Sequence, residues 1–145
     1  MKIYTMGFAQ KSAEEFFNKI KDHEIELLID IRLNNKSQLA GFTKGRDLEY
    51  FLKEIAKCSY VHEPLFAPTK ELLDDYKKDR ISWDRYVEVF SEISAKRDIA
   101  GIFRKKYGSW ERVLLLCSEP QPMRCHRRLV AETVAAETGA EIIHI

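Results

Sequence analysis

The feature that most constrains the fold of this chain is a series of short, nearly continuous apolar runs. The clearest is Arg112 to Cys117, R-V-L-L-L-C, in which every residue after the first is apolar. A strand without a polar face cannot turn one side to water, and such strands are typical of parallel sheets that helices cover on both sides. Segments with helical periodicity separate the runs. The pattern therefore predicts an α/β fold.

Five runs predict strands, at Lys2–Gly7, Ile25–Ile31, Ser59–His62, Arg112–Cys117 and Glu141–Ile145. Between them, apolar residues recur at the spacing of one helical face, and serine or threonine stands where a helix N-cap is expected. Helices are predicted after Ser12, over Leu48–Ile55, from Thr69 to Lys77, after Ser82, over Lys96–Tyr107 and over Arg124–Thr138. We expect a three-layer fold, with a mostly parallel sheet of about five strands and helices on both faces.

The chain has the length of one ordinary domain. Its 145 residues are 45% hydrophobic, which is enough for a core without metal or disulfide staples. We find no internal repeat and no linker, so we expect residues 1–145 to form a single domain. The three cysteines are an odd number at unrelated spacings, which favours reduced thiols over a disulfide framework.

Composition also bears on location and partners. The longest apolar runs span only a few residues, whereas a membrane-spanning helix needs about 20. No secretory signal is visible, so we expect a cytoplasmic protein that does not bind membranes. A net charge of +1 argues against binding nucleic acid through bulk positive charge. Basic residues nevertheless cluster in two segments, from Arg32 to Arg46 and from Arg104 to Arg128.

The predicted topology indicates where chemistry should be found. In a parallel α/β sheet, ligands bind beyond the carboxyl ends of the strands, where loops and helix N-termini meet. Polar or small residues lie at or beside the ends of the predicted strands, and the candidate site residues there are Thr5, Gly7, Asp30, Arg32, His62, Cys117, Ser118 and Glu119. Asp30 closes an apolar strand, so we expect it to pair with Arg32 on the same side of that strand.

The segment from Cys117 to Arg128, C-S-E-P-Q-P-M-R-C-H-R-R, allows three interpretations. Arg32 and Arg127, together with the start of a helix, would suit a phosphate or carboxylate. A cysteine near a helix N-terminus among arginines would have a lowered pKa, and Cys125 fits that description better than Cys117. Metal binding by Cys117, Cys125 and His126 is the third interpretation, but the spacing is not that of a zinc knuckle. We expect neither a resident metal nor a cofactor.

The same segment resembles a known family. Leu116 to Glu119, then a spacer with Pro122, then Cys125-His126-Arg127 resemble in type and spacing the signature of the domain-of-unknown-function 488 family. Thr5-Met6-Gly7 resembles the family's opening T-I-G, and Leu28–Arg32 its D-V-R strand. The resemblance implies a compact α/β fold with a clustered polar signature, and it implies no particular reaction. A more distant similarity is to rhodanese-like domains.

These observations favour a polar cleft at the carboxyl edge of the sheet that binds a small anionic ligand, such as a phosphorylated metabolite or nucleotide. Arg32 and Arg127 would hold the anion, assisted by Thr5, Gly7, Ser118 and His62. In an enzyme, Cys125 or Cys117 would be the reactive thiol or His126 the proton carrier, with Asp30 and Glu119 orienting them. Two alternatives stay open: a nucleic-acid-binding or regulatory module on the same basic edge, and rhodanese-like sulfur transfer.

Overall fold

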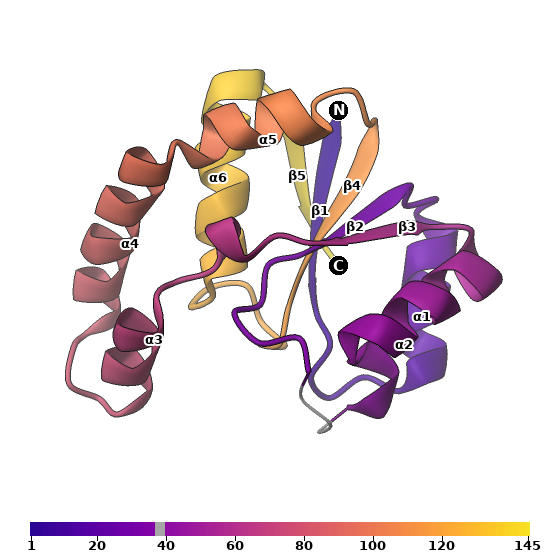
Figure 1. Cartoon of the computed structure of the whole chain (residues 1–145), viewed down its shortest axis with the longest axis horizontal. Helices are drawn as coiled ribbons and strands as arrows, with labels where there is room; N and C mark the ends of the chain where they lie inside the picture. The colour runs from indigo at the N-terminus through magenta and orange to yellow at the C-terminus, as the bar shows by residue number, and fades with distance from the viewer. Residues whose placement is uncertain (37–39) are drawn as a thin grey trace.

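A five-stranded sheet runs through the middle of the molecule (Figure 1). The computed structural model describes residues 1–36 and 40–145. The strands lie in the order β3-β2-β4-β1-β5, and every neighbouring pair is parallel. Their bounds are β1 Lys2–Gly7, β2 Leu27–Asp30, β3 Ser59–His62, β4 Arg112–Cys117 and β5 Glu141–His144. The predicted α/β class is confirmed, and the sheet is parallel throughout.

Helices cover both faces of this sheet. On one face lie α1 and α2, and on the other lie α5 and α6, with α4 packed against α6 and α3 against α4 (Figure 1). The α-helices are α1 Ala13–Asp22, α2 Gly45–Phe51, α3 Lys70–Lys77, α4 Trp83–Arg97, α5 Ile99–Tyr107 and α6 His126–Thr138. Shorter helical segments are η1 Gly41–Thr43, the π-helical η2 Leu52–Ala56 and η3 Pro64–Phe66. Within the described residues, no helix combines the length and the apolar character needed to cross a bilayer.

The three inner strands are mainly apolar because successive side chains enter two different cores. In β4, Val113 and Leu115 pack among α4, α5 and α6, while Leu114 and Leu116 pack among α1, α2 and η2. All four side chains are fully buried. The edge strands β3 and β5 are only partly buried, as their shorter apolar runs require.

The predicted helix starts are confirmed in atomic detail. The hydroxyl oxygens of Ser12, Thr69 and Ser82 each accept a hydrogen bond from the backbone N–H three residues later, at 3.1 Å. Each bond satisfies a donor that the first turn of a helix leaves free, which is why these residue types begin helices.

The helix predicted over Arg124–Thr138 begins two residues later, at His126, and two other helices differ more from the predicted bounds. The helix predicted from Lys96 is divided, because Asp98 adopts a left-handed conformation (φ 56°), ends α4 and caps α5 through its carboxylate. The helix predicted over Leu48–Ile55 begins earlier, at Gly45, and continues as a π-helix. Apolar periodicity alone does not register either change, since the apolar faces continue across both junctions.

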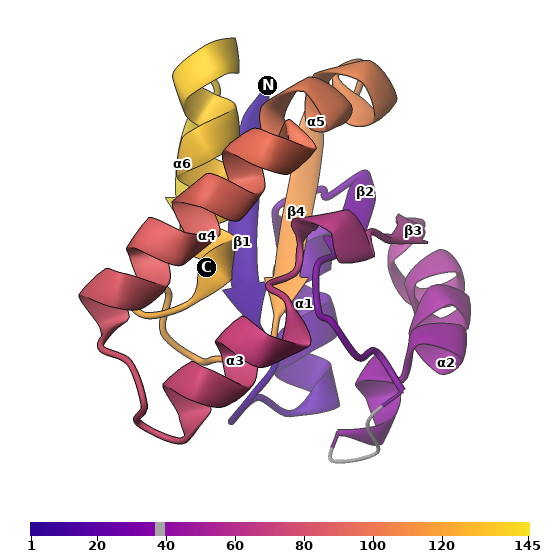
Figure 2. The same ribbon diagram turned by 60° about the vertical axis from the view of Figure 1, so that its left-hand side comes forward.

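The α3–α4 pair extends beyond the carboxyl edge of the sheet. Figure 2 shows α3 below the level of the arrowheads of β1 and β4, and Figure 1 shows the α3–α4 pair standing out to one side of the strands. This placement gives the carboxyl edge a wall that belongs to neither covering layer, and it encloses the space where candidate site residues gather.

Candidate functional site

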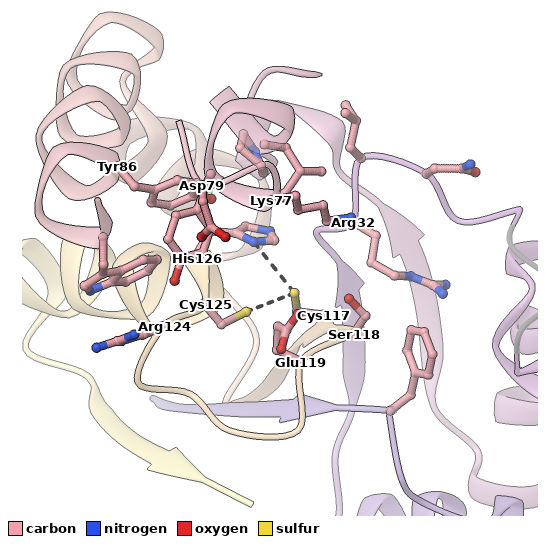
Figure 3. Close-up of a pocket in the computed structure, with 17 residues that line it drawn as sticks. Arg32, Lys77, Asp79, Tyr86, Cys117, Ser118, Glu119, Arg124, Cys125 and His126 are labelled. Atoms are coloured by element: carbon pink, nitrogen blue, oxygen red, sulfur yellow. Dashed lines mark hydrogen bonds between the residues drawn. The ribbon is translucent and has the colours of Figure 1, made fainter. Parts of the chain in front are cut away.

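A cavity of about 530 Å³ lies at the carboxyl edge of the sheet. It is lined by the end of β4, the loop after β2, the loop before α6 and the α3–α4 pair (Figure 3). Of the residues predicted from the sequence, six line it: Arg32, Cys117, Ser118, Glu119, Cys125 and His126. Segments far apart in the chain therefore meet, as the parallel topology predicts.

Two cysteines and a histidine lie together at the inner end of the cavity (Figure 3). The Sγ atom of Cys125 lies 3.0 Å from Cys117 Sγ, and His126 Nδ1 lies 3.7 Å from the same sulfur. Both thiols are free, and all three residues are buried. Cys117 comes from the last position of β4, while Cys125 is the N-cap of α6 and His126 its first residue. The turn between β4 and α6 thus brings both thiols and the imidazole to one point.

The ring of His126 has a fixed orientation. Its Nε2 donates to the backbone carbonyl oxygen of Ile31 at 2.7 Å, which turns Nδ1 toward Cys117. Burial by itself would lower the pKa of His126, but the negative charge and hydrogen bond of Cys117, with the Ile31 carbonyl, raise it above the ordinary value. The geometry therefore favours an imidazolium beside a thiolate.

The two thiols have opposite pKa shifts. The hydrogen bond from Cys125 lowers the pKa of Cys117 well below its ordinary value, and burial opposes this while His126 adds to it. The pKa of Cys125 is raised, first because its proton is held in that hydrogen bond and second because it is buried. The sequence-based assignment of the lowered pKa to Cys125 is therefore wrong. Its thiol occupies the N-cap of α6 but donates to Cys117, which becomes the ionised member.

Arg127 occupies a different place from the one predicted. Its side chain is 1% exposed and does not line the cavity. The guanidinium donates to the backbone carbonyls of Glu119 and Pro120 and to the hydroxyl of Thr5 at 3.3 Å. These contacts connect the loop before α6 to β1, so the geometry gives Arg127 a structural role in positioning that loop. Its predicted role in holding an anion stays a prediction.

Two further predicted site residues, Thr5 and Gly7, lie beside Arg127. Thr5 Oγ1 is 2.5 Å from His144 Nδ1 on the neighbouring strand β5. Gly7 lies so close to the loop that a Cβ atom there would overlap the carbonyl oxygen of Glu119. Neither residue is among those lining the cavity. Both instead bring the end of β1 against the loop that carries the two cysteines.

The predicted pairing of Asp30 with Arg32 is confirmed. Arg32 Nε and Nη2 donate to the two carboxylate oxygens of Asp30 at 2.8 and 2.7 Å, and both residues are buried. The hydroxyl of Tyr60 donates to the same carboxylate at 2.7 Å, and Arg32 Nη2 also donates to the Thr43 carbonyl at 2.6 Å. The positive charge of Arg32 is thus paired with Asp30, although Arg32 still borders the cavity. His62 is set apart from the cavity and contacts the Arg32 carbonyl oxygen at 2.8 Å.

The aromatic residues that form the outer side of the cavity were not among the site residues predicted from the sequence. Tyr76, Trp83 and Tyr86 form it from α3 and α4, with Trp83 and Tyr86 stacked at 4.9 Å between ring centroids. Their helical spacing predicts core residues, and all three do pack against the core between sheet and helices. Their second role as a wall depends on where the α3–α4 pair lies, which local spacing does not encode.

Two basic residues at the rim of the cavity were also not among the predicted site residues. Lys77 and Arg124 are exposed and line the cavity, and neither forms an ion pair with any described residue. Asp79 and Glu119 line the same rim with the opposite charge. Phe8 lines it as well, with the Arg32 guanidinium carbon 5.2 Å from its ring centroid.

The cysteines and the histidine also have the composition of a soft-metal site. The atoms they offer all lie within 4.8 Å of one another. Thiolate sulfur and imidazole nitrogen suit Zn²⁺ or Cu(I). A fourth position would have to come from the cavity, since these residues supply three.

The fold and this site together define a parallel α/β domain with a buried thiol–thiol–imidazole cluster at its carboxyl edge. A family model described as "Domain of unknown function DUF488" matches residues 12–134 of the chain, and the chain belongs to this family. No curated protein matches the chain. No solved structure matches it either, and none of these comparisons supports the expected similarity to rhodanese-like domains.

Proposed function

We propose that this protein is a thiol-dependent enzyme in which the Cys117 thiolate acts on a small anionic ligand held in the adjoining cavity. The observation that carries the proposal is the position of Cys117 Sγ, which borders the cavity with Cys125 Sγ at 3.0 Å and His126 Nδ1 at 3.7 Å. A thiolate, and not a thiol, is the nucleophilic form of cysteine. A donor thiol and an imidazolium on either side are what such an anion needs in a buried place.

His126 has the second role in this proposal. An imidazolium beside a thiolate stabilises it before reaction and can give a proton to a leaving group afterwards. The hydrogen bond from Nε2 to the Ile31 carbonyl holds the ring in place during both steps. Cys117 is therefore the catalytic nucleophile and His126 the general acid.

Two cations of the cavity rim are available to an anionic ligand. Lys77 and Arg124 form no ion pair with a described residue, whereas Arg32 is already paired with Asp30; the acids Asp79 and Glu119 line the same rim. The aromatic wall of Tyr76, Trp83 and Tyr86 adds apolar surface opposite these charges. A ligand with a phosphate or carboxylate at the rim and a less polar part against the wall fits this lining.

Alkylation of the thiols tests the nucleophile. With a chelator present, we expect iodoacetamide to modify Cys117 at neutral pH, at a rate that stays constant until the pH falls below the lowered pKa. Cys58 is an internal control, because burial raises the pKa of its thiol to about 12. Peptide mass mapping reports both rates. If Cys117 reacts no faster than Cys58 at neutral pH, the proposed nucleophile is wrong.

A charged reagent tests the anion site. We expect the rate ratio of iodoacetate to iodoacetamide at Cys117 to fall several-fold in a Lys77→Gln/Arg124→Gln variant. A matched control is Lys53→Gln/Lys105→Gln, which removes two exposed charges that do not line the cavity. An unchanged ratio in the first variant, or an equal fall in both, would contradict anion binding at this rim.

A further inference from the structure

We propose that Cys117 and Cys125 are a catalytic dithiol that reduces small disulfides: Cys117 attacks the substrate disulfide and Cys125 then releases the product by forming a Cys117–Cys125 disulfide. This inference deepens the proposed function, because it uses the same nucleophile and names the substrate class and the role of the second thiol.

The geometry around Cys117 carries the inference. A disulfide bond is about 2.05 Å long, and the two sulfur atoms are 3.0 Å apart, so bond formation needs a movement of only about 1 Å. Cys125 is 3% exposed, and the Cys117 sulfur beside it is the one group it can attack without leaving its place. A second thiol 3.0 Å from the attacking sulfur has the arrangement of a resolving cysteine.

The proton balance can be met by His126. In the first step, the Cys117 thiolate attacks one sulfur of R–S–S–R, the Cys117–S–R bond forms, and the leaving R–S⁻ takes the proton of the imidazolium. In the second step, neutral His126 removes the proton of Cys125, whose sulfur lies within 4.8 Å of the ring nitrogen. The Cys125 sulfur attacks Cys117 Sγ, and the second R–S⁻ leaves with that proton.

The electrons balance in the same way. The substrate disulfide gains two electrons and leaves as two R–SH molecules, while Cys117 and Cys125 lose two electrons and become a disulfide. An external thiol, consumed as two equivalents and itself oxidised to a disulfide, returns the pair to the dithiol form.

The cavity indicates which disulfides would fit. It opens from Cys117 toward the rim charges of Lys77 and Arg124, so a disulfide with carboxylates on each half would have partners there. A volume of about 530 Å³ accommodates a low-molecular-weight disulfide and excludes a folded protein. The inferred substrate is therefore a small, carboxylate-bearing disulfide.

Glutathione disulfide is a suitable probe, used with the full chain after reduction and removal of reductant. We expect the wild-type protein to release two glutathione molecules per chain and to form the Cys117–Cys125 disulfide, seen by peptide mapping. Cys125→Ser should stop at one released molecule, with glutathione bound to Cys117. Cys117→Ser should release none, and Cys58→Ser should behave as the wild type because Cys58 lies in the opposite core.

Three results would overturn the inference: a Cys125→Ser variant without a Cys117 adduct, a wild-type protein that keeps the mixed disulfide, or a disulfide that includes Cys58. Circular dichroism of each variant shows that it is folded. The rate at which iodoacetamide alkylates Cys117 distinguishes a failure of the disulfide reaction from a failure of the proposed function. A Cys117 that alkylates rapidly at neutral pH but forms no disulfide removes only the disulfide reaction, whereas an unreactive Cys117 removes both.

Discussion

At the scale of single residues, His126 adds to the hydrogen bond from Cys125 in lowering the pKa of Cys117. Replacing His126 with Gln keeps a group that can donate to the Ile31 carbonyl but removes the positive charge beside the sulfur. We expect the pKa of Cys117 to rise and its alkylation at neutral pH to slow roughly tenfold for each unit of that rise. The rate of iodoacetamide modification against pH measures it. A His126→Gln profile that overlays the wild-type profile would show that the imidazole does not stabilise the thiolate.

The pair of Asp30 and Arg32 is the other place where one residue has a large expected effect. Asp30→Asn leaves a buried guanidinium without its counter-charge, and breaking a buried pair costs about 3–5 kcal/mol. Urea denaturation measures this free energy of unfolding. The matched control is Glu88→Gln, which breaks the exposed pair with Arg85, whose side chains are 64% and 56% exposed. That change should cost about 1 kcal/mol or less. Similar losses in both variants would contradict the structural role of the buried pair.

Residue types predicted from the sequence were more reliable than residue roles. The D-x-R spacing predicts an ion pair because both side chains lie on one side of a strand, and that pair forms. The lowered pKa was predicted for Cys125 because of its place at a helix N-terminus, but the hydrogen bond between the two thiols lowers the pKa of Cys117 and raises that of Cys125. The Cys117 sulfur comes from another element, and its distance from Cys125 depends on how the loop before α6 is folded.

At the scale of elements, the contact between β1 and the loop before α6 positions the site. Gly7→Ala places a methyl group against the Glu119 carbonyl and the Arg127 guanidinium, so the loop must move. We expect a loss of about 1–3 kcal/mol in unfolding free energy, as in other overpacked positions, and slower alkylation of Cys117.

A glycine with open surroundings provides the control for this prediction. Among the residues that the structure describes, Gly41→Ala meets no atom within 4 Å of the new methyl group. Its stability and its Cys117 alkylation rate should equal those of the wild type. If Gly7→Ala alkylates at the wild-type rate, the position of Cys117 does not depend on the contact with β1.

Elements with a strong local signal were predicted closely. The strands β1, β3 and β4 have the predicted bounds, because their apolar runs begin and end sharply. Helix starts at Ser12, Thr69 and Ser82 were also correct, since capping is a local hydrogen bond. The break at Asp98 was not predicted, because a left-handed residue between two apolar helical faces leaves their periodicity unchanged.

At the scale of the whole molecule, the opposite pKa shifts of Cys117 and His126 link the stability of the fold to pH. The raised pKa of His126 contributes stability that is complete below its unfolded value of 6.5 and is lost as the pH rises through the folded pKa. The lowered pKa of Cys117 contributes stability that is complete above its unfolded value of 9.0 and is lost as the pH falls through the folded pKa. Between pH 6.5 and 9.0, the two unfolded pKa values, the folded and unfolded cluster bind the same number of protons. The stability that the cluster provides therefore does not change with pH in this range.

The prediction is a plateau in the stability that the cluster provides. We expect the difference in unfolding free energy between the wild type and Cys117→Ser/His126→Gln to be constant from about pH 6.5 to about 9 and to decrease on either side. Taking the difference cancels the titration of groups common to both proteins. Urea denaturation across this range measures it. A difference that rises or falls steadily through the range would contradict the charged pair.

The sequence by itself determined the class of fold, the helix caps and the meeting of distant residues at one sheet edge. These follow from local periodicity and from the rule that parallel strands all end on the same side. Only the tertiary structure decided which thiol has the lowered pKa, that Arg127 contacts the loop before α6, and that α3 and α4 line the cavity. Each of these depends on distances of a few ångströms between side chains from separate elements, and packing sets such distances while local sequence does not.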